Sequence, residues 1–224
     1  MPTFQIPHYG HVHIPSGITD LDSFRRWIHS DTLPEKLKVH FIRGEVWTDF
    51  YTEEMFSHNR VKTALGIALG GLIEGGALGM YVSDGMLLTN EAAELGTTPD
   101  AMFVSNAAVA SGRVTFVSGV RGEAEATEMV GTPDLVVEIV SPSSEDKDTE
   151  WLMSGYWNAG VPEYWVIDAR RNPPLFDIYK RGPKGYSESR KTDGWVKSAV
   201  LKRSFRFLRQ KGKHGFPVFQ LEVR

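Results

Sequence analysis

The clearest pattern in this sequence is a short apolar run that one carboxylate interrupts. Between a Gly-Thr-Pro entry at residues 131–133 and a Ser-Pro exit at 141–142, the residues from Leu135 to Val140 are apolar and mostly β-branched, except for Glu138. Such a run predicts a strand buried on both faces of a sheet. An ionised carboxylate is costly there unless a cation or several donors compensate it, so Glu138 is the first candidate for chemistry.

The hydrophobic periodicity elsewhere predicts the elements around this strand. Helical spacing covers 18–28, 53–74 and a segment from Ser143 or Ser144 to Gly160, and short strands are expected over 39–50 (a pair bent at Gly44), 80–82, 86–89, 98–105, 163–168 and 176–179. Thr19 or Asp20 is the expected cap of the first helix. Residues 106–130, with the acidic Glu123, Glu125 and Glu128, are predicted to form an inserted, polar and partly mobile loop.

The order of these elements predicts an α/β fold. The strands at 135–140 and 163–168 are separated by a helix and only about 20 residues, which predicts a parallel, right-handed crossover. We therefore expect a mixed sheet, with antiparallel strands plus one parallel βαβ crossover, flanked by helices. Residues 1–17 are expected to be an N-terminal arm, and 18–224 a single domain with a basic, β-rich segment from about 180 to 224.

Composition and charge limit the kinds of site, location and partner that this protein can have. The absence of cysteine excludes disulfides and thiolate metal sites, and no run reaches the roughly 18 apolar residues of a membrane span. The start of the chain lacks the pattern of a signal peptide, so we expect a cytoplasmic protein without a membrane partner. Residues 180–224 hold 13 of the 25 Lys and Arg but only 3 of the 28 Asp and Glu, which fits either a polyanion partner or a solvated hairpin.

The acidic residues suggest where an ion would bind. Asp134 and Glu138 share one strand face but are about 13 Å apart, too far to hold one ion together. Asp100 opens another strand; if that strand lies beside the central one at about 4.8 Å, Asp100 and Glu138 can meet across the ladder. Two carboxylates that close repel each other unless a divalent cation or a proton lies between them, and oxygen ligands favour Mg²⁺ or Mn²⁺.

A metal-activated water that attacks a phosphodiester also requires a cation to stabilise the developing negative charge. The position two residues after Glu138 is Val140, and Lys147 at the start of the next helix is the nearest lysine. Glu54 and His58 lie four residues apart on one helix face, from which both can project toward the sheet.

Each of these residues also has a purely structural interpretation. Asp100 and Asp134 follow prolines and can complete turns, an interpretation we favour for Asp134. Glu138 can be neutralised by a buried Arg or Lys, Lys147 can belong to a solvated helix start, and Glu54 with His58 can form a surface pair. His8, His11 and His13 can be metal ligands, although a loose N-terminal arm explains them more simply.

Several separated blocks of this sequence resemble one family. The blocks GTPDLVVEIVSPSSEDKDT, YWNAGVPEYWVIDAR, TPDAMFVS and EEMFSHNRVKTAL are similar to the Uma2 family (DUF820), and the resemblance runs from about Phe24 to Val223. It implies the restriction-endonuclease-like fold of PD-(D/E)xK nucleases, with Asp100 as the first acid, Glu138 as the second, and Glu54 or His58 contributed by the first helix. The family lacks the lysine of Glu-x-Lys and often carries one four residues before the tyrosine, where this chain has Leu152. The resemblance therefore leaves Lys147 as the replacement.

Three functions remain open from the sequence. The first is a Mg²⁺-dependent endonuclease that acts on DNA, for which a homodimer is plausible because two strands need two sites. The second is a nucleic-acid-binding or protein-binding module on the same fold, without hydrolysis. The third is a structural accessory protein without an ion site.

Overall fold

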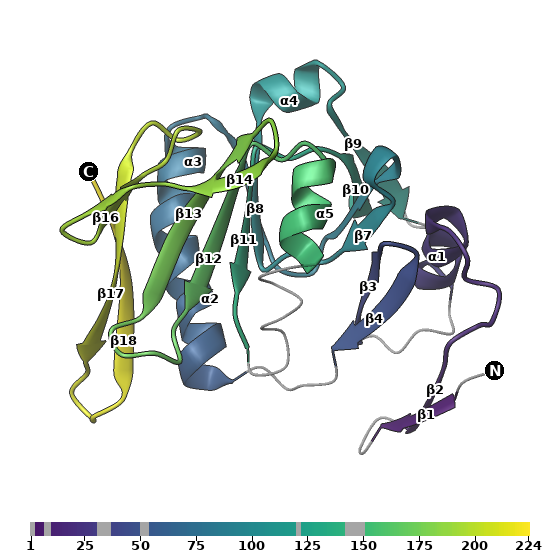
Figure 1. Ribbon diagram of the computed structural model, residues 1–224, viewed down its shortest axis with the longest axis horizontal. Helices are drawn as coiled ribbons and strands as arrows, with labels where there is room; N and C mark the ends of the chain where they lie inside the picture. Colours follow the sequence, from purple (N-terminus) through teal and green to yellow (C-terminus); the bar gives the residue numbers. More distant parts are fainter. Residues whose placement is uncertain (1–2, 7–9, 31–36, 50–53, 120–121, 142–150) are drawn as a thin grey trace.

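The computed structural model describes residues 3–6, 10–30, 37–49, 54–119, 122–141 and 151–224. Its centre is a six-stranded mixed sheet with the order β14-β13-β12-β11-β8-β5 (Figure 1). The strands are β5 (Gly79–Ser83), β8 (Ala101–Ser105), β11 (Leu135–Ile139), β12 (Glu163–Asp168), β13 (Leu175–Gly182) and β14 (Gly185–Glu188). β11 and β12 are parallel and the other pairs are antiparallel, so the predicted crossover is confirmed.

A second six-stranded sheet has the order β4-β3-β7-β6-β10-β9. Its strands are β3 (Lys38–Ile42), β4 (Glu45–Asp49), β6 (Leu87–Asn90), β7 (Leu95–Thr97), β9 (Val114–Gly119) and β10 (Gly122–Gly131). The predicted bend at Gly44 is confirmed, because this residue lies between β3 and β4 with a φ of 78°. β10 pairs with β6 in parallel, a second parallel pair that the sequence did not predict.

The prediction of a polar, mobile loop over residues 106–130 is wrong. The segment forms α4 (Asn106–Ala110), β9 and most of β10, and Val114 and Met129 are buried in the core. Glu128 is fully buried, where it accepts hydrogen bonds from Arg25 and Thr89 and contacts His29. Its acidic side chain therefore joins β10 to the first helix instead of facing solvent.

Helices fill the space on both faces of the central sheet (Figure 1). One face is covered by a continuous helical stretch, η1 (Met55–Asn59), α2 (Arg60–Leu65), η2 (Gly66–Gly70) and α3 (Gly71–Gly75), together with the C-terminal sheet. The other face is covered by α5 (Leu152–Asn158) and the second sheet. Odd and even residues of β11 consequently pack into two different cores, as a strand buried on both faces requires.

Most of the remaining elements lie toward the two ends of the chain. β15 (Lys191–Thr192), β16 (Trp195–Lys197), β17 (Ser204–Lys211) and β18 (Pro217–Val223) form the antiparallel C-terminal sheet, and η3 (Glu91–Ala93) links β6 to β7. α1 (Leu21–Ile28) is capped by Asp20, one of the two predicted caps. Within the predicted arm, β1 (Thr3–Ile6) pairs with β2 (Gly10–His13), and His8 lies outside the described residues. No helix in the described part of the chain has the length and apolarity of a membrane span.

Candidate active site

Asp100, just before β8, and Glu138, in β11, lie at the same end of this strand pair. β8 is antiparallel to β11 with Ala101 opposite Val137, and the same register places Asp100 opposite Glu138. The predicted adjacency of the two strands is therefore confirmed. Both carboxyl side chains are buried, with exposed fractions of 5% for Asp100 and 4% for Glu138. Two acids enclosed this way require compensating donors or cations.

The Asp100 carboxylate is compensated on both of its oxygens. Oδ2 accepts a hydrogen bond from the Ile139 backbone N–H at 2.9 Å and lies 3.2 Å from Nε2 of His58. Oδ1 lies 3.3 Å from the Nζ atoms of both Lys38 and Lys62. His58 comes from η1, Lys62 from α2 and Lys38 from β3, so two helical segments and the second sheet converge on this one carboxylate.

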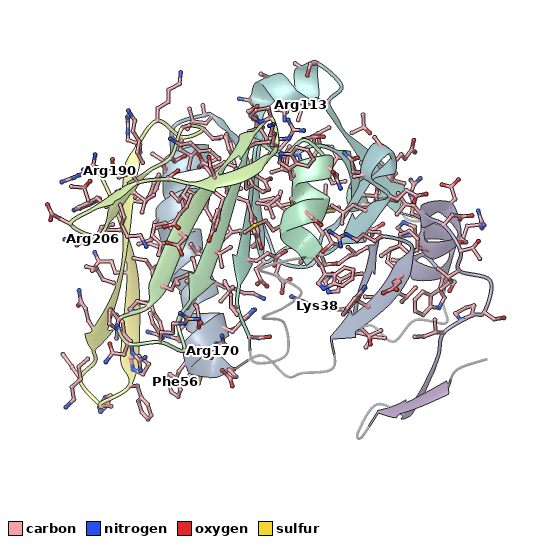
Figure 2. All side chains as sticks on the ribbon, viewed as in Figure 1. Lys38, Phe56, Arg113, Arg170, Arg190 and Arg206 are labelled. Carbon is pink, nitrogen blue, oxygen red and sulfur yellow. The ribbon has the colours of Figure 1, made fainter. Side chains whose placement is uncertain are left out.

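A further carboxylate, Asp84, links the same two lysines. It lies in the turn between β5 and β6, with Oδ1 2.8 Å from Nζ of Lys38 and Oδ2 2.6 Å from Nζ of Lys62. The two lysines and the two aspartates thus form one closed ion cluster at the strand ends. Figure 2 labels Lys38 where the second sheet approaches the central one.

This cluster shifts the pKa values of an acidic and a basic member in opposite directions. Burial alone would raise the pKa of Asp100, but the hydrogen bond and charge of His58 and the charges of the two lysines hold it well below its usual range. Burial alone would lower the pKa of Lys38, but the Asp100 and Asp84 carboxylates reverse this and raise it. Asp100 is therefore a carboxylate and Lys38 an ammonium at neutral pH.

Glu138 is oriented by a tyrosine from the crossover helix. The Tyr156 hydroxyl donates a hydrogen bond to Oε1 of Glu138 at 2.5 Å, and both groups are buried. Burial, followed by the charge of Glu138, raises the pKa of Tyr156, so the phenol stays protonated and remains a donor. Glu138 also helps to raise the pKa of Lys38, which makes this lysine part of its compensation, as the structural interpretation of Glu138 expected.

The other predicted residues have different positions. Glu54 is exposed, and its carboxylate accepts a hydrogen bond from Ser57; in the described contacts it does not meet the acid pair. Lys147 lies outside the described residues. Asp134 is bound by Arg113 and by the Ser105 backbone N–H, a structural arrangement. The structure thus brings together Asp100, Glu138 and His58, and leaves Glu54 and Asp134 elsewhere.

Sequence reasoning missed three charged members of the cluster, Lys38, Lys62 and Asp84. Lys62 follows His58 by four residues on one helical stretch, a spacing that places both on the same face and was a usable signal. Asp84 lies in a Ser-Asp-Gly turn between the predicted strands at 80–82 and 86–89, and an aspartate is so common in such a turn that it gave no signal of a charged cluster. Lys38 gave no local signal, because its partners lie on a different sheet.

The carboxylates of the site fit a hard divalent cation. No group of three or more His, Asp or Glu side chains in the described part of the chain is arranged as a preformed metal site. Mg²⁺, however, is commonly held by one or two carboxylates and keeps several of its waters. Asp100 and Glu138 are two such carboxylates, both buried and at the same end of the strand pair, and the nearby ammonium groups would compete with an ion for the Asp100 oxygens.

A mixed sheet with one βαβ crossover and an acidic pair at the strand ends defines a restriction-endonuclease-like fold. The chain belongs to the Uma2 family, described as "Putative restriction endonuclease", whose family model matches residues 21–207. A similar solved structure is that of a "putative nuclease belonging to DUF820" from Anabaena variabilis, with a TM-score of 0.60 and 18% sequence identity over 82% of this chain and 90% of that chain. The comparison with curated proteins gave no match. The family and the fold expected from the resemblance are both confirmed.

Proposed function

We propose that this protein is a metal-dependent nuclease that hydrolyses phosphodiester bonds of DNA. The observation that carries the proposal is the buried pair of Asp100 and Glu138, directly opposed across two strands and flanked by two lysines. The family description supports nuclease activity at the level of the family. The metal, Mg²⁺ or Mn²⁺, and the DNA substrate are parts of the proposal.

Each residue of the cluster has a distinct role in this proposal. Asp100 and Glu138 would hold the ion, which when bound would polarise the phosphoryl oxygen and acidify a water molecule. Lys62 and Lys38 bring positive charge to the place where the phosphate gains negative charge. His58 and the Ile139 N–H fix the Asp100 carboxylate, and Lys147 remains a proposed additional cation.

A second candidate is a nucleic-acid-binding or protein-binding module without hydrolysis. The observation that favours it is the closed ion cluster, because Lys38 and Lys62 already neutralise Asp84 and Asp100. In such a module the lysines would serve stability, and a divalent ion would be superfluous. The two candidates therefore differ in whether an ion can displace the lysines from Asp100.

The test is calorimetric titration of Mn²⁺ and Mg²⁺ into the wild type and Glu138→Ala, followed by nicking of supercoiled plasmid by both proteins. The nuclease proposal expects the loss of both ion binding and nicking in Glu138→Ala, with Asp134→Ala retaining both. Ion binding without nicking by the wild type would point to a degenerate or partner-activated enzyme. No ion binding by any form would overturn the metal assignment of Asp100 and Glu138 and favour the binding module.

The same assay addresses assembly on duplex DNA. A nuclease that acts as a homodimer should produce linear plasmid together with nicked circles, because two sites then act on the two strands. Sedimentation velocity of the protein with and without duplex DNA measures the assembly directly. The cytoplasmic location expected from the sequence stays a prediction.

A further inference from the structure

The tip of the β17–β18 hairpin lies at the same end of the molecule as the acid pair. Nη1 of Arg209 in β17 donates a hydrogen bond to the backbone oxygen of Arg171 at 3.3 Å, just beyond the end of β12. Arg170 in turn donates to the backbone oxygen of Ser141, just beyond β11. Since β11 and β12 are parallel, both strands end on the side where Asp100 and Glu138 meet.

An aromatic pair connects this hairpin tip to the helical stretch that carries His58. The rings of Phe216 and Phe56 are stacked, with their centroids 4.7 Å apart and an interplanar angle of 5°. Figure 2 labels Phe56 near Arg170, at the lower end of the molecule. Phe56 precedes His58 by two residues, so the stack and the candidate active site share the short segment η1.

This aromatic pair is only partly covered by protein. Phe216 is 56% exposed and the neighbouring Met55 is 60% exposed, whereas most large apolar side chains of the chain are buried. Because Phe56 covers one side of the Phe216 ring, only the other side is available to a ligand. A planar partner can extend the stack there.

The charged side chains of the hairpin tip are all basic, whereas the exposed Glu54 lies two residues before Phe56 on the other side of the stack. Arg209, Lys211 and Lys213 are exposed, and in the part of the chain that the structure describes none of them pairs with a carboxylate. Residues 209–221 contain no Asp or Glu. Basic groups that surround an exposed aromatic ring are the combination that binds single-stranded nucleic acid, because phosphates meet the cations and a base meets the ring.

We infer that the β17–β18 hairpin tip binds a nucleic-acid strand and leads it toward the acid pair. The phosphates of the strand contact Arg209, Lys211 and Lys213, and one unpaired base stacks on the exposed side of Phe216. The inference deepens the proposed function, since it names the form in which that substrate meets the protein. The occupant is a strand with accessible bases, and a fully paired duplex binds less tightly.

The test is fluorescence anisotropy of labelled 20-nucleotide single strands and matched duplexes with the full chain, in EDTA and at two salt concentrations. Phe216→Leu keeps the apolar bulk but removes the π-face, and it should weaken single-strand binding roughly tenfold. Phe216→Trp should restore it. Lys211→Glu with Lys213→Glu should weaken binding to both forms of DNA and lower the salt dependence.

The control is the same double charge reversal within the basic segment but far from the hairpin tip, Lys184→Glu with Lys202→Glu. These lysines lie in the β13–β14 and β16–β17 turns, at the other ends of β13 and β17, and their reversal should weaken single-strand binding much less than that of Lys211 and Lys213. Equal effects of the two reversals would overturn the inference, as would wild-type binding by Phe216→Leu. So would self-association that Phe216→Leu abolishes, because the patch would then be an interface between copies of the chain.

The failure of this inference can be told apart from the failure of the proposed function. Because binding is measured without divalent ions, it does not depend on catalysis. If plasmid nicking depends on Glu138 while the Phe216 and lysine variants bind as the wild type does, the inference is wrong and the nuclease proposal stands. If the variants lose binding while no protein nicks plasmid, the inference stands and the nuclease proposal fails.

Discussion

Two Thr-Pro-Asp tripeptides open neighbouring strands of the central sheet and have different surroundings. Residues 98–100 lead into β8 and residues 132–134 lead into β11. Because the two strands are antiparallel, their entries lie at opposite ends of the pair. The same tripeptide therefore lies in two different tertiary environments, so Asp100 and Asp134 can be compared directly.

At one end Asp134 closes a structural clip. Its carboxylate binds Arg113 and accepts a hydrogen bond from the Ser105 N–H, while Arg113 also donates to the backbone oxygen of Thr132. The register places Val104 opposite Asp134, so no second acid is present there. One cation and one backbone N–H thus bind this carboxylate, one on each oxygen.

At the other end Asp100 meets Glu138, two lysines and a histidine. The tripeptide therefore determines only the turn and the strand entry. What makes one aspartate a candidate ligand is the carboxylate across the ladder and the convergence of cations from three separate elements.

The largest expected effect comes from neutralising one acid at each end. Glu138→Gln keeps an acceptor for Tyr156 but removes the charge that would hold an ion, so the rate of plasmid nicking should fall on the order of 10³-fold. Asp134→Asn should leave that rate unchanged and lower the free energy of unfolding by about 1–3 kcal/mol. Nicking rates and urea unfolding of both variants make the comparison. Wild-type nicking by Glu138→Gln would remove the distinction between the two ends.

Removal of one cation at each end should have the next largest effect. Lys62→Met removes one of the two lysines that contact Asp84 and Asp100, and we expect roughly 10²-fold slower nicking. Arg113→Met removes the cation of the structural clip and should destabilise the protein by about 1–3 kcal/mol without slowing the folded enzyme. Thermal unfolding and single-turnover nicking separate these outcomes. Equal loss of nicking in both variants would show that the lysine acts only through stability.

Acid should destabilise the Asp100 end in a defined direction. The pKa of Asp100 is held well below its usual range, so its ion pairs stabilise the fold fully above the unfolded-state pKa of about 4, and this stabilisation is lost as pH falls further. Asp100→Asn should therefore flatten the decline in melting temperature between about pH 5 and pH 2, a contribution on the order of 2 kcal/mol. The same substitution at Asp134 measures what any strand-opening aspartate contributes. An unchanged acid profile in Asp100→Asn would contradict the ion cluster.

These comparisons show how far the sequence alone could lead. The apolar run around Glu138 predicted its strand, and the turn residues before Asp100 predicted the neighbouring strand, because both signals are local. The expectation that Asp100 and Glu138 lie opposite each other followed from the pairing of their strands, whose register is set by the two buried faces. Lys38 could not be found, since its contact with Asp100 spans 62 positions and two sheets.

The mistaken loop over residues 106–130 has a similar cause. Its acidic residues are typical of a solvated segment, and nothing local indicates that Glu128 is neutralised by Arg25 and contacts His29, about 100 positions earlier. A buried charge is recognisable only when its partner is known. For the same reason the sequence identified Glu138 as unusual but left open which groups compensate it.

The smallest expected effect concerns the hydroxyl that orients Glu138. Tyr156→Phe removes one hydrogen bond to a buried carboxylate while it preserves the ring packed against Tyr164. Since Lys38 still compensates the charge of Glu138, nicking should slow by only about threefold to tenfold. The free energy of unfolding should fall by about 1–2 kcal/mol. The ratio of Mn²⁺ affinity between Tyr156→Phe and wild type, measured by calorimetry, shows whether the hydroxyl positions the carboxylate for an ion. Weaker ion binding with equal stability would assign Tyr156 a positioning role, whereas equal ion binding with lower stability would restrict it to the core.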